Sequence, residues 1–289
     1  MAAQPELLFA AQTELGECPV WDSGRDCLFF MDITEKALHR FDWASSAATR
    51  IDLPSIGGGL VLGRDGALLA GLQTGIYRVD PDRASISFIV DPEPDRPDNR
   101  LNEAKCDPQG RLWIGSMPTR DRSPSGRLYR MDKDGRIVAV LDEIIIPNAL
   151  VWLNDEKMLF ADSFRRVIWS FRYDGESGTI GDRRVFADCR DEPGIPDGIA
   201  LDAEGCLWNA QFGGGRVVRY APDGRIIAAI PLPATQVTSC AFAGDGLKQL
   251  VVITTKRLLD DRSRHEQTHA GDIFVLEAPA PGAPAPMFG

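Results

Sequence analysis

The chain has 289 residues, of which 44% are hydrophobic and 26% charged, the composition of a folded globular protein. Its net charge of −10 and its lack of any Lys/Arg cluster argue against nucleic acid or an anionic membrane surface as a partner. No apolar run approaches the roughly 18 residues that a membrane-spanning helix needs.

The N-terminal segment lacks the basic and apolar regions of a secretory signal, so we expect a cytoplasmic protein. The six cysteines are scattered without CxxC spacing, and most of them lie in strand-like runs. We therefore expect free, buried thiols in a reducing compartment rather than a disulfide framework.

A turn flanked by short apolar runs recurs six times, each copy starting about 42 to 48 residues after the previous one. Three of the copies read Asp65-Gly-Ala-Leu-Leu-Ala, Asp107-Pro-Gln-Gly-Arg-Leu-Trp and Asp202-Ala-Glu-Gly-Cys-Leu-Trp. A period of this size is typical of a β-propeller or of a solenoid array.

A second phrase follows each turn and alternates apolar with polar residues, as in Gly75-Ile-Tyr-Arg-Val-Asp. This period of two indicates half-buried strands, so each repeat predicts about four short strands, which make one blade. We predict an all-β, six-bladed β-propeller of four-stranded antiparallel blades as a single domain over residues 1–277, with almost no helix. Residues 278–289 are expected to form a Pro/Ala-rich, low-complexity tail that cannot build a core of its own.

The sixth repeat ends early, because only the tail follows Ile273-Phe-Val-Leu. An incomplete blade would leave an unpaired strand edge, which propellers avoid. The N-terminal run Glu6-Leu-Leu-Phe-Ala-Ala-Gln has the pattern of the missing strand. We predict that it pairs with the last blade and closes the propeller.

Polar side chains recur about five residues before the turns, where the first strand of each repeat begins. Four repeats place a carboxylate or an amide there, namely Glu17, Asn102, Asn148 and Asp197, and the sixth repeat offers Ser239. Two carboxylates that converge on one axis would repel each other unless a cation lay between them. Oxygen ligands suit a hard divalent ion such as Ca²⁺, Mg²⁺ or Mn²⁺. The alternative is that these side chains only cap the starts of strands.

The motifs around these residues resemble the regucalcin/senescence-marker protein and gluconolactonase family of six-bladed propellers. The similarity covers nearly the whole chain. It is densest in Leu15-Gly-Glu-Cys-Pro-Val-Trp, Asn99-Arg-Leu-Asn-Glu-Ala-Lys-Cys-Asp, Pro147-Asn-Ala-Leu-Val-Trp and Gly194-Ile-Pro-Asp-Gly-Ile-Ala-Leu-Asp.

The resemblance implies an enzyme that hydrolyses sugar lactones to aldonic acids. It implies that Glu17, Asn148 and Asp197 hold one divalent cation, and that Arg100 and Asn102 contact the substrate. The family usually has Asn-Asp-Gly-Lys where this chain has Asn102-Glu-Ala-Lys, so Glu103 is a further candidate for binding substrate. The cation is left open among Ca²⁺, Zn²⁺, Mg²⁺, Mn²⁺ and Fe²⁺.

Three protein ligands would leave positions on the cation for water and for a substrate oxygen. We expect Asp197 to act both as a ligand and as the general base toward water, and Arg100 to stabilise the developing anion. The partner is then a small sugar lactone, and the protein a monomer or weak oligomer. Two alternatives are a non-catalytic Ca²⁺-binding propeller and a metal-dependent esterase that acts on other esters.

One motif suggests different chemistry. His265-Glu-Gln-Thr-His269 matches the HExxH pattern of zinc proteases, which requires both histidines on one face of a helix. Polar residues precede it and Ala270-Gly271 follows it just before a predicted strand, so there is no room for a long helix. We expect a solvated loop here and no zinc protease.

Overall fold

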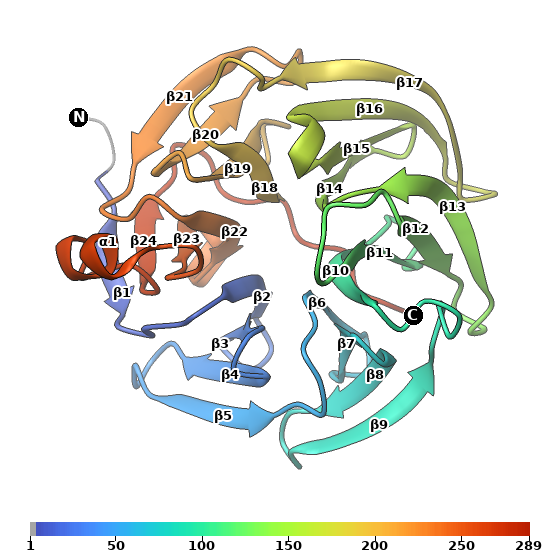
Figure 1. Ribbon diagram of the computed structural model, residues 1–289, viewed down its shortest axis with the longest axis horizontal. Helices are drawn as coiled ribbons and strands as arrows, with labels where there is room; N and C mark the ends of the chain where they lie inside the picture. The colour runs from blue at the N-terminus through green and yellow to red at the C-terminus, as the bar shows by residue number, and fades with distance from the viewer. Residues whose placement is uncertain (1–3) are drawn as a thin grey trace. The chain divides into compact units, whose positions relative to one another are not determined.

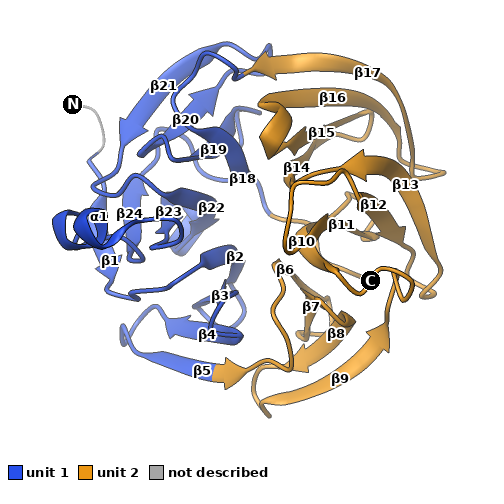
Figure 2. Ribbon diagram, viewed as in Figure 1, with its two compact units in different colours: residues 1–50, 189–284 blue, residues 51–188, 285–289 orange. Residues whose placement is uncertain are grey.

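The computed structural model describes residues 4–289 and divides the chain into two compact units. Unit 1 comprises Met1–Arg50 and Cys189–Pro284, and unit 2 comprises Ile51–Asp188 and Ala285–Gly289 (Figure 2). Each unit has three four-stranded sheets (Figure 1). Six such sheets are the blades of a six-bladed β-propeller, so the predicted fold class is confirmed.

The sheets of unit 1 come from the first, fifth and sixth repeats. The first repeat forms β2 (Gly16–Asp22), β3 (Cys27–Asp32), β4 (Ala37–Asp42) and β5 (Ala48–Asp52), of which the last two residues are counted with unit 2. The fifth forms β18 (Ile195–Leu201), β19 (Leu207–Phe212), β20 (Arg216–Tyr220) and β21 (Ile226–Pro231). The sixth forms β22 (Val237–Ala243), β23 (Gln249–Thr254) and β24 (Ile273–Glu277).

The sheets of unit 2 come from the second, third and fourth repeats. The second repeat forms β6 (Gly59–Leu62), β7 (Leu68–Leu72), β8 (Gly75–Asp80) and β9 (Ser85–Val90). The third forms β10 (Asn99–Cys106), β11 (Leu112–Pro118), β12 (Gly126–Met131) and β13 (Ile137–Ile144). The fourth forms β14 (Pro147–Asn154), β15 (Lys157–Asp162), β16 (Val167–Asp174) and β17 (Thr179–Asp188).

The first strand of each repeat lies at an edge of its sheet, and we call these six the leading strands: β2, β6, β10, β14, β18 and β22. Helix is scarce within residues 4–289, as predicted. It consists of one six-residue α-helix, α1 (Asp261–Glu266), and two 3₁₀ turns, Ser163–Arg165 and Asp245–Leu247.

The recurring turn has a physical explanation in its aspartate. After β10, Asp107 accepts hydrogen bonds from the backbone N–H of Arg111 at 2.9 Å and from the indole N–H of Trp113 at 2.9 Å. After β18, Asp202 accepts the corresponding indole bond from Trp208 at 3.0 Å. The carboxylate thus closes the turn and anchors a buried tryptophan, which is why Asp, Gly, Leu and Trp recur together at this spacing.

The N-terminal run forms the predicted extra strand. β1 (Glu6–Phe9) pairs antiparallel with β24, with Glu6 opposite Val275 and Leu7 opposite Phe274. It completes the four-stranded sheet β1-β24-β23-β22 of unit 1. The prediction that this run supplies the missing strand of the sixth blade is confirmed.

The C-terminal tail builds no core of its own, but it packs against the sheets, which its composition did not lead us to expect. In unit 1 Ala280 is buried, and the Pro281 carbonyl accepts a hydrogen bond from the Ala203 N–H at 2.8 Å. In unit 2 the Phe288 ring packs against an apolar cluster, and its N–H bonds the Leu62 carbonyl at 2.9 Å. Low-complexity composition did not prevent packing, because an extended Pro/Ala chain still offers backbone groups that can bond exposed turns and strand edges.

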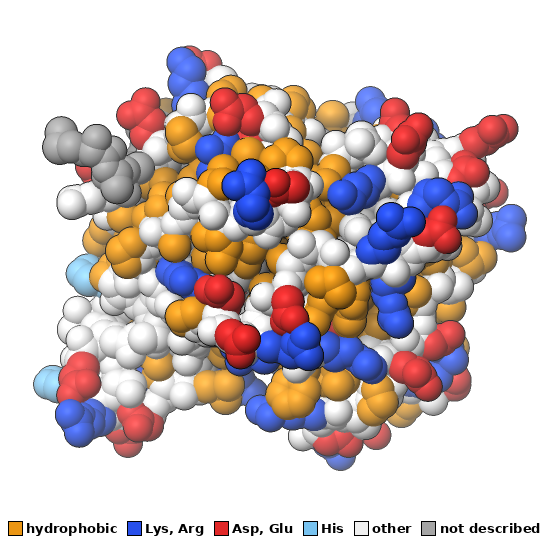
Figure 3. Space-filling view, turned by 90° about the horizontal axis from the view of Figure 1, so that it is seen from above, with side chains coloured by type: hydrophobic (Ala, Val, Ile, Leu, Met, Phe, Trp, Pro, Cys, Tyr) orange, Lys and Arg blue, Asp and Glu red, His pale blue; other side chains and the backbone are white. Residues whose placement is uncertain are grey.

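All six cysteines are free and buried, as predicted. Burial raises the pKa of the Cys27 thiol to about 11, so it stays a neutral thiol at physiological pH. On the face shown in Figure 3, Lys/Arg and Asp/Glu side chains are interspersed with apolar ones. No helix within residues 4–289 is long and apolar enough to cross a membrane.

Candidate metal and substrate site

Five of the six leading strands share an irregularity at the positions that the sequence singled out. The register with the neighbouring strand shifts at or beside Glu17 in β2, Asn102 in β10, Asn148 in β14, Asp197 in β18 and Ser239 in β22. Only β6 of the second repeat pairs without such a shift. Shifts of this kind bend a strand and redirect its side chains, and they are frequent beside active sites.

The backbone is also unusual directly after two of these positions. Cys18, which follows Glu17, has a φ of 56°, and Ala149, which follows Asn148, has a φ of 50°. A left-handed conformation in a residue other than glycine costs about 1–3 kcal/mol and persists only where the surrounding structure requires it. Such strain is common where a side chain has to be aimed for function.

Unit 1 carries both predicted carboxylate ligands. Glu17 and Asp197 are largely buried, with 8% and 6% of their surface exposed. Strands β2 and β18 both pack against β22, which carries the fully buried Ser239. A Cβ atom on Gly198 would lie 2.1 Å from the Ser239 hydroxyl oxygen, so only glycine fits after Asp197. On the other side, the Thr238 hydroxyl bonds the Gly16 carbonyl at 2.7 Å, next to Glu17.

Unit 2 carries the predicted amide ligand and the predicted substrate-binding residues. Arg100 donates a hydrogen bond to the Asn102 side-chain oxygen at 2.7 Å. The Asn102 amide N–H donates in turn to the Asn148 side-chain oxygen at 3.3 Å and to the Pro147 carbonyl at 3.0 Å. The structure therefore brings Arg100, Asn102 and Asn148 together in one chain of hydrogen bonds.

The orientation of the Asn148 amide follows from its other partner. Its N–H₂ group donates to the Ser163 hydroxyl at 2.8 Å, so its oxygen points the opposite way. An amide oxygen has two lone pairs, and the single 3.3 Å bond from Asn102 occupies only one of them. The other lone pair is available for a cation, which fits the predicted role of Asn148.

Glu103 lies at the register shift of β10 and is buried, with 4% of its surface exposed. Burial raises the pKa of its carboxyl, and the positive charge of Lys105 only partly opposes this. The Lys105 ammonium lies 3.5 Å from Oε1 of Glu103, but that oxygen has no hydrogen-bond partner. Contact between Glu103 and substrate stays a prediction.

The donor set suits a hard cation. Within residues 4–289 no group of three or more His, Cys, Asp or Glu side chains is arranged to hold a metal ion. Two carboxylates and one amide oxygen, as in Glu17, Asp197 and Asn148, are ligands that Ca²⁺, Mg²⁺ and Mn²⁺ accept.

The HExxH segment lacks the helical geometry that the zinc motif requires. His265 lies on α1, but the helix ends at Glu266 and His269 lies beyond it. The His269 ring bonds the Asp272 carboxylate at 3.0 Å. The expected loop is in fact an exposed single turn and a half of helix, because Asp260 caps its N-terminus by accepting from the Ser263 N–H at 2.7 Å.

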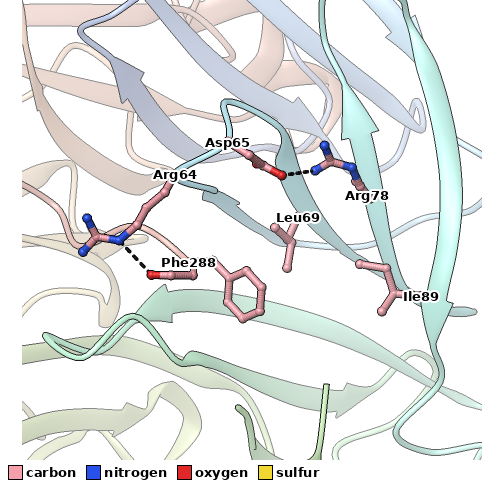
Figure 4. Close-up of a pocket in the computed structure, with 7 residues that line it drawn as sticks. Arg64, Asp65, Leu69, Arg78, Ile89 and Phe288 are labelled. Atoms are coloured by element: carbon pink, nitrogen blue, oxygen red, sulfur yellow. Dashed lines mark hydrogen bonds and ion pairs between the residues drawn. The ribbon is translucent and has the colours of Figure 1, made fainter. Parts of the chain in front are cut away.

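Unit 2 also has a surface cavity of about 240 Å³ beside the turn that follows β6. It is lined by Arg64, Asp65, Leu69, Arg78, Ile89, Phe288 and Gly289 (Figure 4). Its charged groups already have partners: Arg78 pairs with Asp65 at 2.8 Å, and Arg64 donates to the Gly289 carbonyl at 2.7 Å (Figure 4). The cavity therefore offers apolar walls and a packed tail rather than catalytic groups.

Sequence reasoning missed the residues that hold the predicted ones in place. Ser163 orients Asn148, and Asn209 on β19 donates to the backbone of Asp197 at 2.8 Å. A signal for Asn209 exists in Leu207-Trp-Asn-Ala-Gln-Phe, where two amides interrupt an otherwise apolar strand. Ser163 carries no comparable signal, because it lies in a turn where serine is common.

Comparison with known proteins finds similarity over nearly the full length. A family model described as SMP-30/Gluconolactonase/LRE-like region matches residues 15–256. The chain is 35% identical to Pentonolactonase XacC of Haloferax volcanii over 277 residues, 93% of each protein. It is 32% identical to 6-deoxy-6-sulfogluconolactonase of Pseudomonas putida over 280 residues, 95% of this chain and 94% of that protein.

Among solved structures, the chain is similar to regucalcin of Agrobacterium tumefaciens, described as a calcium-binding protein. The TM-score is 0.95 at 29% sequence identity, over 99% of this chain and 98% of the other. The similarity therefore includes the leading strands of both units.

Proposed function

Because the chain belongs to the SMP-30/gluconolactonase/LRE-like family, we propose that it hydrolyses a sugar lactone to the aldonic acid with one bound divalent cation. Relatives that share about a third of their residues with it over nearly the full length are named as lactonases. The observation that carries the proposal is the placement of Glu17, Asn148 and Asp197 at equivalent register shifts of three leading strands.

Glu17, Asn148 and Asp197 would hold the cation. When bound, a divalent cation polarises a carbonyl and makes a coordinated water more acidic. Hydrolysis also requires that a residue of the chain remove a proton from the attacking water. Asp197 is the group we assign to this step, because a carboxylate that uses one oxygen as a ligand keeps the second for a proton.

Arg100 and Asn102 act on the substrate side. The Asn102 side-chain oxygen accepts a hydrogen bond from the Arg100 guanidinium at 2.7 Å, and the Asn102 amide donates to Asn148. Arg100 is therefore held close to the candidate ligand Asn148. In hydrolysis, water oxygen bonds to the lactone carbon, the ring C–O bond breaks, and the ring oxygen takes up a proton. Arg100 binds oxygen atoms of the sugar and stabilises negative charge as it develops on the former carbonyl oxygen.

The test is a hydrolysis panel with a pH indicator. Gluconolactone, xylonolactone, arabinonolactone and galactonolactone would be offered to metal-free protein and to protein supplied with Ca²⁺, Mg²⁺, Mn²⁺, Zn²⁺ or Fe²⁺. We expect acid release from at least one lactone, only with metal, and loss of that activity on chelation. Turnover that is equally fast without metal would refute the role of the cation.

A second candidate function is non-catalytic Ca²⁺ binding, which is supported by the similarity to regucalcin, a calcium-binding protein. The same panel distinguishes the two functions. Ca²⁺ binding measured by calorimetry, together with no turnover of any lactone with any metal, would establish this function in place of the first.

A further inference from the structure

The second strand of the fifth repeat carries two amides in the interior. Asn209 and Gln211 on β19 are both 0% exposed. They alternate with Trp208 and Ala210, which belong to an apolar cluster of unit 1, so the amides point away from that cluster. Burying an amide is unfavourable unless it finds hydrogen-bond partners, and this strand buries two.

The other blades show that the register shift does not require these amides. Asn209 pairs with Ile199, just after the shift of β18, and Gln211 pairs with Pro196, just before it. On the other shifted blades, the second-strand residues that pair directly after the shift are Phe29, Ile114, Leu159 and Ile253, and those that pair directly before it are Met31, Gly115, Ala161 and Thr254. None of these eight carries an amide. The pair is a feature of the blade that holds Asp197.

The two amides form a relay that ends on the backbone of Asp197. The Asn209 N–H₂ group donates to the carbonyls of Asp197 at 2.8 Å and Gly198 at 3.2 Å. Because carbonyls only accept, this fixes the orientation of Asn209 and turns its oxygen toward Gln211. The Gln211 N–H₂ group then donates to that oxygen at 2.6 Å.

Burying polar side chains on both sides of the Asp197–Gly198 peptide lowers the stability of the fold. This indicates that these side chains serve a function other than stability. The remaining oxygen of Gln211 has no hydrogen-bond partner, and neither does the hydroxyl of Ser239, which faces Gly198 from the other side. Unsatisfied buried polar atoms destabilise a fold. An apolar pair such as Phe29 and Met31 on the first blade would avoid this cost, but it would leave the two carbonyls of Asp197 and Gly198 without these bonds.

We propose that Asn209, oriented by Gln211, is a positioning residue that holds the Asp197–Gly198 peptide and so directs the Asp197 carboxylate. The proposal rests on the proposed role of Asp197 as metal ligand and base. Partners that orient a metal ligand typically change metal affinity by about 10- to 100-fold when they are removed.

The experiment compares Asn209→Leu, which keeps the volume but removes both bonds, with Gln211→Leu, which leaves Asn209 in place but frees its oxygen. Metal affinity is measured by calorimetry on the folded protein, and kcat and KM with the best lactone of the panel. We expect Asn209→Leu to weaken metal binding and to lower kcat by at least about tenfold each, with KM less affected. Gln211→Leu should have the same effects but smaller ones, and it serves as the test variant if Asn209→Leu fails to fold.

The matched control is Thr254→Val. Thr254 is equally buried on β23, the second strand of the sixth blade, and its hydroxyl bonds the Asp272 carbonyl at 2.7 Å. The Thr254→Val substitution should lower thermal stability while leaving metal affinity and kcat within about twofold of the unmodified protein. If the Asn209 and Gln211 variants behave like this control, their role is only structural and the inference is wrong.

The readouts separate this inference from the proposed function. Metal binding that depends on Asn209, without lactone turnover by the unmodified protein, would support the inference and refute the hydrolase. Metal-dependent turnover that is indifferent to Asn209 and Gln211 would do the reverse.

Discussion

A leading strand carries a buried carboxylate near each end, and the two carboxylates have different surroundings. In β18, Asp197 lies at the start and Asp202 directly follows the end, and both are buried. Asp202 accepts hydrogen bonds from Trp208 at 3.0 Å and from the Arg219 guanidinium at 2.6 and 2.9 Å. Asp197 instead lies at a register shift. It is followed by Gly198, where a larger residue would clash with Ser239, and its carbonyl accepts a hydrogen bond from the Asn209 amide.

The third repeat shows the same contrast. At the end of β10, Asp107 is fully buried and accepts from Arg111, Trp113 and Tyr173. Earlier in the strand, Glu103 is buried with one oxygen lacking a hydrogen bond. Burial alone therefore does not identify a functional carboxylate. A carboxylate surrounded by donors stabilises the fold, whereas one at an irregular, strained or unsatisfied position indicates a function.

The largest expected effect comes from Asp197→Asn. Because an amide cannot accept the proton of water, we expect kcat to fall by about 10²- to 10⁴-fold. The variant should retain its fold, since the neighbouring backbone bonds do not involve the carboxylate. Kinetics with saturating metal measures the loss, and a decrease of less than tenfold would exclude the role of general base.

For Asp202→Asn we expect the opposite result, a loss of stability without a loss of activity. Replacing the buried carboxylate leaves the Arg219 charge with only the exposed Glu204 carboxylate as its charged partner among those that bond it here, and we expect the free energy of unfolding to fall by about 3 kcal/mol. The folded fraction should keep its kcat and its metal affinity. Urea unfolding and kinetics on the same preparation measure both quantities, and a loss of activity without a loss of stability would break the comparison between the two strand ends.

Glu103→Gln tests how the buried Glu103 carboxyl affects the pH dependence of stability. Since burial raises its pKa above the ordinary 4.5, the folded protein holds this proton to higher pH than the unfolded chain does. Its contribution to stability is then full below pH 4.5, and it is lost as the pH rises from there through the raised pKa. We expect the Gln variant to gain stability relative to the unmodified protein as the pH increases. Equal differences in the free energy of unfolding at pH 4.5 and pH 8 would contradict this.

The smallest effect is expected from the double change His265→Ala/His269→Ala. Both side chains are exposed, His265 on α1 and His269 beyond its end, and the His269 ring makes one hydrogen bond with the buried Asp272 carboxylate. Lactone hydrolysis should be unchanged and stability altered by less than about 1 kcal/mol. A loss of metal-dependent activity would mean that the HExxH segment takes part after all.

The amino-acid sequence by itself determined the blade count, the strand of the N-terminus and the free cysteines, and its motifs identified the family that the comparisons confirm. These features depend on local patterns: alternation within a strand, and an aspartate that bonds residues two to six positions later. The position of the candidate ligands at the strand starts was readable for the same reason, because each repeat carries its own copy.

Only the tertiary structure decided which side chains meet. Asn102 and Asn148 are bonded although they lie 46 positions apart, and the Asn209 amide bonds a carbonyl on another strand 12 positions away. The tail likewise packs through backbone contacts with distant repeats, such as the bond from Phe288 to Leu62 at the end of β6. Such contacts depend on strand register and on the space between strands, which no local periodicity encodes.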